Sequence, residues 1–224
     1  YYGSLDSYAI QDLLYAGISP MDIMSCGAYV NSCDFVMAVE MYYGMLDSYA
    51  IQDLLSAYIY PMDIMFCGAN VNLCDLIMAM EMYYGSLDSY AIQDLLYAGI
   101  SPMDIMSCGA YVNSCDFVMA VEMYYGMLDS YAIQDLLSAY IYPMDIMFCG
   151  ANVNLCDLIM AMEMYYGSLD SYAIQDLLYA GIYPMDIMFC GANVNSCDFV
   201  MAVEMYYGMF CLLYTSPSPR DKHR

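Results

Sequence analysis

The sequence predicts an all-α fold, an array of short helices stacked repeat upon repeat. The chain repeats with a period of 41 residues, so one structural unit recurs along it. Inside each unit, apolar residues recur at helical spacing between residues that typically begin and end helices. We expect two or three short helices per repeat, a size typical of solenoid-like helical arrays.

Five repeats fill most of the chain. Repeats 1 and 3 are identical (type 1), repeats 2 and 4 are identical (type 2), and the two types differ at ten positions. Repeat 5 combines features of both types. The bounds of the five repeats are 1–41, 42–82, 83–123, 124–164 and 165–205, and residues 206–210 begin a sixth.

The ten differences are unequal in size. Some are mild apolar exchanges, such as Phe35 in type 1 against Leu76 in type 2. Others replace a small residue by a large one, such as Ser25 against Phe66. Such an exchange overfills a core or exposes apolar surface. The sequence therefore indicates repeats that are not held to one packing solution.

The first expected helix begins near Leu5. Leu5, Ala9 and Leu13 lie four residues apart with polar residues largely opposite, which is an amphipathic helical pattern. Gly17 suits the left-handed position after a helix. Tyr58 takes this place in type 2, and a tyrosine should resist a positive φ there.

The second expected helix has the clearest start in the repeat. Ser19 as N-cap, a proline next and Asp22 at the third position together mark a helix N-terminus. We expect this helix to run to about Cys26 and to break at Gly27. In type 2, Tyr60 replaces the serine, so the cap should be lost.

A third segment follows. Asn31 or Ser32 is the expected cap, and Gly44 the expected end. The segment 34–43 is apolar on almost all sides, which fits a buried helix. A strand at Phe35–Tyr43 and its equivalents, in a mixed or poorly packed fold, is the alternative.

One short stretch resembles a known family. Gly68–Asn72, within the sequence CGANVN, is similar to the helix-to-loop end of an ankyrin repeat. The resemblance implies a helix ending at Phe66. The period of 41 residues and the absence of a Thr-Pro-Leu-His element separate the chain from that family.

The composition is strongly acidic. Residues 1–210 contain 25 of the 26 acidic residues and no lysine, arginine or histidine. Nucleic acid is not an expected partner, because phosphate neutralisation needs cationic side chains. No membrane span is expected either, since the longest uncharged run in a repeat, Ile23–Cys33, is shorter than the roughly 18–20 residues required. With no start methionine and no signal peptide, the N-terminus is interpreted as a fragment edge and no compartment is assigned.

Two cysteines recur in each repeat, Cys26 and Cys33 in the first. A zinc site needs four ligands, and the repeats hold no histidine. In one continuous helix the pair would lie about 10 Å apart along the axis, too far for a disulfide. We interpret them as small core residues or incidental thiols.

Acidic and amide side chains also recur. The five acids of each repeat could align as a calcium-binding ladder, but no EF-hand loop is present, and a solvated acidic face is the favoured interpretation. Asn70, Asn72 and Asp75 form a loose cluster of oxygen ligands. No catalytic, cofactor-binding or metal-ligating residue is predicted, and the chain is not expected to be an enzyme.

The C-terminal segment differs from the repeats. Cys211–Asp221, CLLYTSPSPRD, resembles one reading frame of a transposase-type sequencing adapter. The resemblance implies that residues 211–224 are a non-native tail, which we expect to be disordered.

Three functional hypotheses remain open. The chain is a repetitive interaction or scaffold protein fragment with protein partners, a secreted Tyr/Met-rich structural material, or the translation of a tandem DNA repeat with no function. Met-rich faces can bind partners and Tyr-rich repeats can serve as cross-linkable structural material, but ordinary core filling is the favoured interpretation of both residue types.

Overall fold

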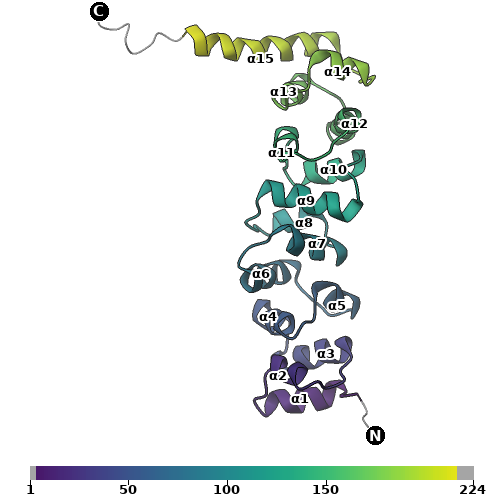
Figure 1. The fold of residues 1–224 in the computed structure, drawn as a ribbon, viewed down its shortest axis with the longest axis vertical. Helices are drawn as coiled ribbons and strands as arrows, with labels where there is room; N and C mark the ends of the chain where they lie inside the picture. The colour runs from purple at the N-terminus through teal and green to yellow at the C-terminus, as the bar shows by residue number, and fades with distance from the viewer. Residues whose placement is uncertain (1–3, 216–224) are drawn as a thin grey trace, which may run out of the picture. The chain divides into compact units, whose positions relative to one another are not determined.

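The computed structural model describes residues 4–215, and over this range the protein is all-α, with three helices per repeat and no sheet (Figure 1). The predicted fold class is confirmed, and the alternative strand at Phe35–Tyr43 is wrong because those residues are helical. The chain divides into two compact units, Tyr1–Tyr124 and Tyr125–Arg224. The helices of repeats 1–3 are α1 (Ser7–Tyr15), α2 (Pro20–Ser25), α3 (Ser32–Tyr43), α4 (Ser48–Ser56), α5 (Pro61–Phe66), α6 (Leu73–Tyr84), α7 (Ser89–Tyr97), α8 (Pro102–Ser107) and α9 (Ser114–Tyr125). Those of repeats 4 and 5 are α10 (Ser130–Ser138), α11 (Pro143–Phe148), α12 (Leu155–Tyr166), α13 (Ser171–Tyr179), α14 (Pro184–Phe189) and α15 (Ser196–Thr215).

The first helix of each repeat is capped by an aspartate. In α1 the Asp6 carboxylate accepts a hydrogen bond from the Ala9 N–H at 2.9 Å. At the other end, Gly17 has φ +83°, as expected, and the Ile18 N–H donates to the Leu13 carbonyl. Tyr58 adopts the same left-handed conformation in type 2, with φ 62°.

The second helix begins at the predicted cap. The Ser19 hydroxyl accepts from the Asp22 N–H at 3.2 Å and donates to the Asp22 carboxylate at 2.6 Å. In type 2 the Tyr60 side chain makes no cap, yet the Asp63 carboxylate accepts from the Tyr60 N–H at 3.2 Å. The prediction of a lost cap is therefore half right, because the acid keeps its part of the capping box. The helix ends at Phe66, as the ankyrin-like stretch implied.

The third helix carries much of the core. Asn31 caps it, accepting from the Cys33 N–H at 2.8 Å, and Gly44 ends it with φ 81°. Phe35 and Val39 are fully buried. Beside it, Leu5 and Val30 form an isolated parallel bridge that joins the start of the repeat to the loop before α3.

Each repeat packs on itself and on the next. In the first unit α1 packs against α3, and α4 against α6; α2 and α3 also contact α4, and α3 contacts α5 (Figure 1). In the second unit α10 packs against α12 and α13 against α15, while α12 contacts α13 and α14. The apolar residues at these contacts are buried, as shown by Ile51, Leu54 and Ile64 at 0% exposure.

The differences between the repeat types fall at core positions where they are mild and outside the core where they are severe. Phe35 in type 1 and Leu76 in type 2 are both fully buried, and the other two mild exchanges lie beside them in the core. The severe exchanges place large side chains at the surface: Tyr58 and Phe66 are both exposed, Phe66 by 85%. The expectation that the repeats lack a common packing solution is therefore wrong, because corresponding helices have equivalent bounds in both types.

The last helix is longer than its counterparts. α15 continues through Gly208, where the corresponding Gly44 ends α3. The expected start of a sixth repeat, 206–210, lies inside α15, as do residues 211–215 of the adapter-like segment. Residues 216–224 of the expected disordered tail lie outside the described residues. In the described part of the chain, no helix is both long enough and apolar enough to cross a membrane.

Candidate interaction surface

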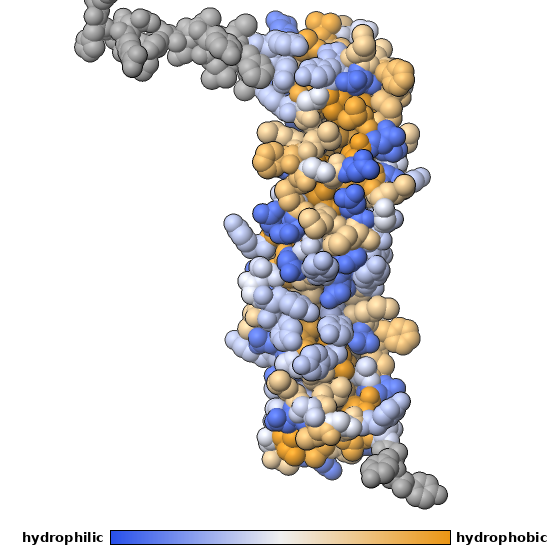
Figure 2. Space-filling model, in the orientation of Figure 1, coloured by the Kyte–Doolittle hydropathy of each residue, from blue (hydrophilic) through white to orange (hydrophobic). Residues whose placement is uncertain are grey.

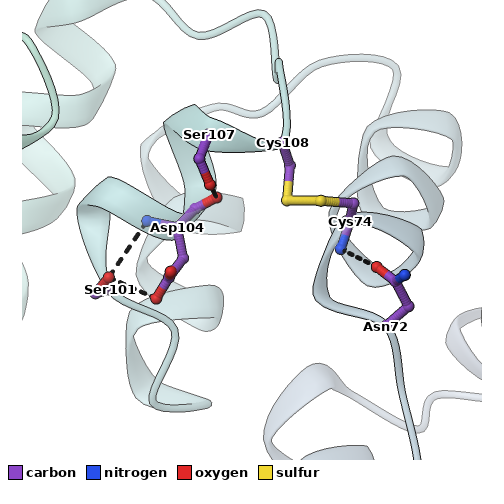
Figure 3. Close-up of a disulfide and its surroundings, with 6 residues drawn as sticks. All are labelled: Asn72, Cys74, Ser101, Asp104, Ser107 and Cys108. Atoms are coloured by element: carbon purple, nitrogen blue, oxygen red, sulfur yellow. Dashed lines mark hydrogen bonds between the residues drawn. A yellow bond between two sulfur atoms is a disulfide. The ribbon is translucent and has the colours of Figure 1, made fainter.

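Cysteines of consecutive repeats form disulfides. In the first unit Cys33 pairs with Cys67 and Cys74 with Cys108, each with Cα atoms 5.1 Å apart (Figure 3). Each bond joins the start of a third helix to the residue after the second helix of the next repeat. The second unit contains an equivalent bond between Cys156 and Cys190. The interpretation of the cysteines as core residues or incidental thiols is wrong at these positions.

Both ends of such a disulfide are held by helix caps. On one side the Asn72 amide oxygen accepts from the Cys74 N–H at 2.9 Å (Figure 3). On the other side Ser101 caps α8 through Asp104, and the Ser107 hydroxyl donates to the Asp104 carbonyl at 2.9 Å. Local capping therefore places both sulfur-bearing residues at ordered helix termini. In contrast, Cys26 and Cys197 are exposed and carry free thiols.

The recurring acids act mainly as structural hydrogen-bond acceptors. Asp6 and its equivalents cap the first helix of each repeat, and the Asp22 carboxylate accepts from the hydroxyl of the capping Ser19, as Asp104 does from Ser101. Among residues 4–215 no group of three or more His, Cys, Asp or Glu side chains could hold a metal ion.

The structure does bring Asn70, Asn72 and Asp75 together. They line a recess of about 390 Å³ with Met45 and Leu46. A matching recess of about 380 Å³ lies at the same place in repeat 4. One of these oxygens is already in use, because the Asn72 amide oxygen caps α6.

A tyrosine–aspartate pair joins the end of α3 to α4. The Tyr43 hydroxyl donates to the Asp53 carboxylate at 2.5 Å, and the same bond joins Tyr125 to Asp135. This hydrogen bond, with a smaller effect of burial, raises the pKa of Tyr43 to about 12. The phenol is therefore a fixed donor at neutral pH.

The aspartates at the position of Asp53 in repeats 3 and 5, Asp94 and Asp176, are partly buried. Burial, followed by the charge of Asp88, raises the pKa of Asp94. Burial and the neighbouring Asp170 do the same for Asp176 in the second unit. No cation lies among residues 1–210 to offset this effect.

Large apolar side chains recur on the surface beside the acids (Figure 2). In every repeat the second residue of the first helix is a strongly exposed tyrosine, and a methionine near the middle of the third helix is about half exposed. The five tyrosines are Tyr8, Tyr49, Tyr90, Tyr131 and Tyr172. The five methionines are Met37, Met78, Met119, Met160 and Met201. We call the tyrosines and the aspartates that follow them by four residues the Tyr–Asp surface.

Comparison with protein-family models, curated proteins and solved structures finds no match for this chain. The sequence shows that tyrosines, methionines and acids recur, but not which of them are exposed, because exposure depends on how the repeats pack.

Proposed function

We propose that this chain is an interaction scaffold whose repeats bind protein segments rich in arginine or lysine. One observation carries the proposal: every repeat exposes a tyrosine with an aspartate four residues further along the same helix, exposed in repeat 1 and half-buried in the others, and residues 1–210 contain no cation. Such a surface lacks the positive half of an ion pair, and a cationic partner would supply it.

The spacing on the helix supports a combined site. Tyr8 and Asp12 are four residues apart on α1, so their side chains lie on the same face. Both are exposed to solvent. An arginine placed there meets a carboxylate and the face of an aromatic ring, and each contact favours a guanidinium.

The overall charge supports the same kind of partner. The formal net charge is −23 at pH 7, so like charges repel one another along the folded chain. Binding a cationic segment relieves this repulsion and is accelerated by long-range attraction. Repetition adds avidity, because one extended partner can engage several repeats at once.

The distribution of the differences between repeat types favours a folded protein over a frame without function. Buried Phe35, Val36 and Val39 change only to other apolar residues, Leu, Ile and Met. The loss of volume at the first position is offset by gains at the other two, and volume-conserving exchanges are those that cores tolerate best.

Fluorescence polarisation with a labelled peptide of alternating arginine and serine tests the proposal. We expect saturable binding that weakens strongly with added salt, and no binding of a matched peptide of glutamate and serine. Changing all five exposed tyrosines to leucine should weaken binding by about tenfold or more, because each exposed cation–π contact contributes ~0.5–1 kcal/mol.

The matched control changes the same five tyrosines to phenylalanine, which keeps the rings, and its affinity should stay within about twofold of the original. Changing the paired aspartates to asparagine should reduce both affinity and salt dependence. Failure of the arginine peptide to bind at low salt would overturn the proposal. Equal binding by the leucine and phenylalanine proteins would remove the tyrosines from it.

A further inference from the structure

A recess lies between repeats 2 and 3, where α5 packs against α7. Its volume is about 230 Å³, and two tyrosines, two aspartates, a proline and a methionine line it. These six residues are Tyr60, Pro61, Met62, Asp63, Asp94 and Tyr97. We call this recess the Tyr60–Tyr97 pocket. It combines aromatic rings with carboxylates and contains no positive charge.

The two carboxylates of the pocket are half-buried and have few hydrogen-bond donors. Asp63 accepts from the Tyr60 N–H at 3.2 Å, whereas no hydrogen bond reaches the Asp94 carboxylate in the part of the chain that the structure describes. Burial, followed by the charge of Asp88, raises the pKa of Asp94. A cation bound in the pocket would therefore supply an interaction that the chain itself does not.

The two tyrosines stand at fixed places beside these acids. Tyr60 directly precedes α5, where the Asp63 carboxylate holds its backbone N–H. Tyr97 ends α7, three residues after Asp94 on the same side of the helix, and its ring packs edge to face on Tyr124 with centroids 5.2 Å apart. Both pocket tyrosines are exposed, so a ligand can reach their rings, whose faces attract cations.

The junction between repeats 1 and 2 has the same acids in a different setting. Ser19 and Ser56 occupy the positions of the two pocket tyrosines there. The Ser19 hydroxyl donates to the Asp22 carboxylate at 2.6 Å, and the Tyr43 hydroxyl donates to the Asp53 carboxylate at 2.5 Å. Both carboxylates are thus hydrogen-bonded within the chain, and neither pocket ring is present.

The second unit contains the same combination of residues between repeats 4 and 5. There α11 packs against α13, and Tyr142, Asp145, Asp176 and Tyr179 take the corresponding positions. The Tyr142 N–H donates to the Asp145 carboxylate at 3.3 Å, and burial again raises the pKa of Asp176. Each compact unit therefore contains one such set.

We propose that these two sites bind a methylated ammonium group, presented by a lysine side chain of a cationic protein segment. The inference rests on the proposed function for the kind of partner and adds the chemical group that the pocket selects. Methylation keeps the positive charge of lysine, which the carboxylates attract, and adds apolar surface that contacts the tyrosine rings, Pro61 and Met62. An unmodified ammonium is strongly hydrated and loses that water on entering an aromatic recess.

Fluorescence polarisation of the full chain with two labelled peptides tests the selection. Both peptides alternate lysine with serine, and in one of them every lysine is trimethylated. We expect the trimethylated peptide to bind about fivefold or more tightly than the unmodified one, because only its methyl groups contact the rings without losing a firm hydration shell. Tetramethylammonium chloride should displace it more effectively than sodium chloride at equal ionic strength, although with lower affinity than the peptide itself.

Exchanges that occur naturally between the repeat types provide the variants. Tyr60→Ser together with Tyr142→Ser installs the residue of type 1 repeats, and should bring the two lysine peptides within about twofold of each other. The matched control, Phe66→Ser with Phe148→Ser, makes the same kind of exchange at exposed positions outside the pocket and should retain the preference. The peptide of arginine and serine should bind both variants alike, because the five tyrosines of the Tyr–Asp surface are unchanged. Circular dichroism confirms that both variants remain helical.

Three results would overturn the inference. One is equal affinity of the original protein for the two lysine peptides. Another is a preference for trimethylated lysine that survives Tyr60→Ser with Tyr142→Ser. The third is binding of tetramethylammonium as tightly as the trimethylated peptide, which would make the ligand a small molecule and not a protein segment. Failure of the arginine peptide alone, with the preference for methylated lysine intact, would instead overturn the proposed role of the Tyr–Asp surface and support the pocket.

Discussion

Cys33 and Cys67 lie in consecutive repeats, 34 residues apart in the sequence, and form a disulfide across the junction between α3 and α5. The bond lies beside the apolar contact of the same helices, so covalent and hydrophobic links coincide. Within the first unit the next junction repeats this arrangement. Junction stability should therefore depend on redox conditions.

Removing the bond between Cys74 and Cys108 should destabilise the first unit. The bond closes a loop of 34 residues, and restricting such a loop in the unfolded chain contributes about 3–4 kcal/mol. Both cysteines are changed to serine, and urea unfolding is followed by circular dichroism. The control is Cys26→Ser, whose thiol is free, with an expected change within about 0.5 kcal/mol. Equal stability of the two proteins would refute a structural role for the bond.

The core of α3 should accept the type 2 residues only as a set. Phe35→Leu alone removes buried volume and should cost about 1–2 kcal/mol of unfolding free energy. Adding Val36→Ile and Val39→Met returns volume to the same region, and the triple variant should lie within about 1 kcal/mol of the original. Thermal unfolding of the single and triple variants measures the coupling. Additive losses would show that the exchanges do not compensate one another.

Tyr58 should be a point of backbone strain. Its φ is 62°, a left-handed conformation that glycine adopts without penalty. Tyr58→Gly should raise the unfolding free energy by about 1 kcal/mol, because the exposed ring contributes little packing. The converse change, Gly17→Ala at φ +83°, should lower it. A destabilised Tyr58→Gly protein would mean that the ring makes a favourable contact.

The Tyr43–Asp53 hydrogen bond should make the stability of the chain depend on pH in the alkaline range. The pKa of Tyr43 is raised to about 12 in the folded chain, against 10.0 for an unperturbed phenol. The folded state therefore binds the proton more tightly, and the resulting stability is fully present below pH 10 and is lost as the pH rises toward 12. Tyr43→Phe should remove that part of the pH dependence, and Tyr8→Phe should leave it in place. Absorbance titration at alkaline pH and thermal melts between these limits measure both effects.

The helix boundaries could be predicted because local residues determine them. Ser19, Asn31 and Gly44 act through hydrogen bonds or backbone preferences within a few residues, so sequence spacing was enough. Tyr58 was harder, since the hydrogen bonds of its neighbours impose the left-handed turn on a residue that disfavours it.

The disulfide pairing and the exposure of individual side chains could not be predicted from local sequence patterns. Cys33 is seven residues from Cys26 in its own repeat but bonds to Cys67 in the next, and only the packing of α3 against α5 reveals the choice. Likewise, the replacement of Ser25 by Phe66 suggests an overfilled core, but Phe66 is exposed to solvent. Both features depend on contacts between repeats, which local sequence patterns do not encode.

Disulfide mapping tests the central claim, that consecutive repeats pack through the junction of Cys33 and Cys67. Cleavage before aspartate releases fragments 22–33, 63–74 and 104–115, each holding both cysteines of its repeat. The account predicts that, without reductant, mass spectrometry finds these three fragments joined to one another, and that reduction separates them. Separate fragments, each closed by its own internal disulfide or carrying two free thiols, would contradict it.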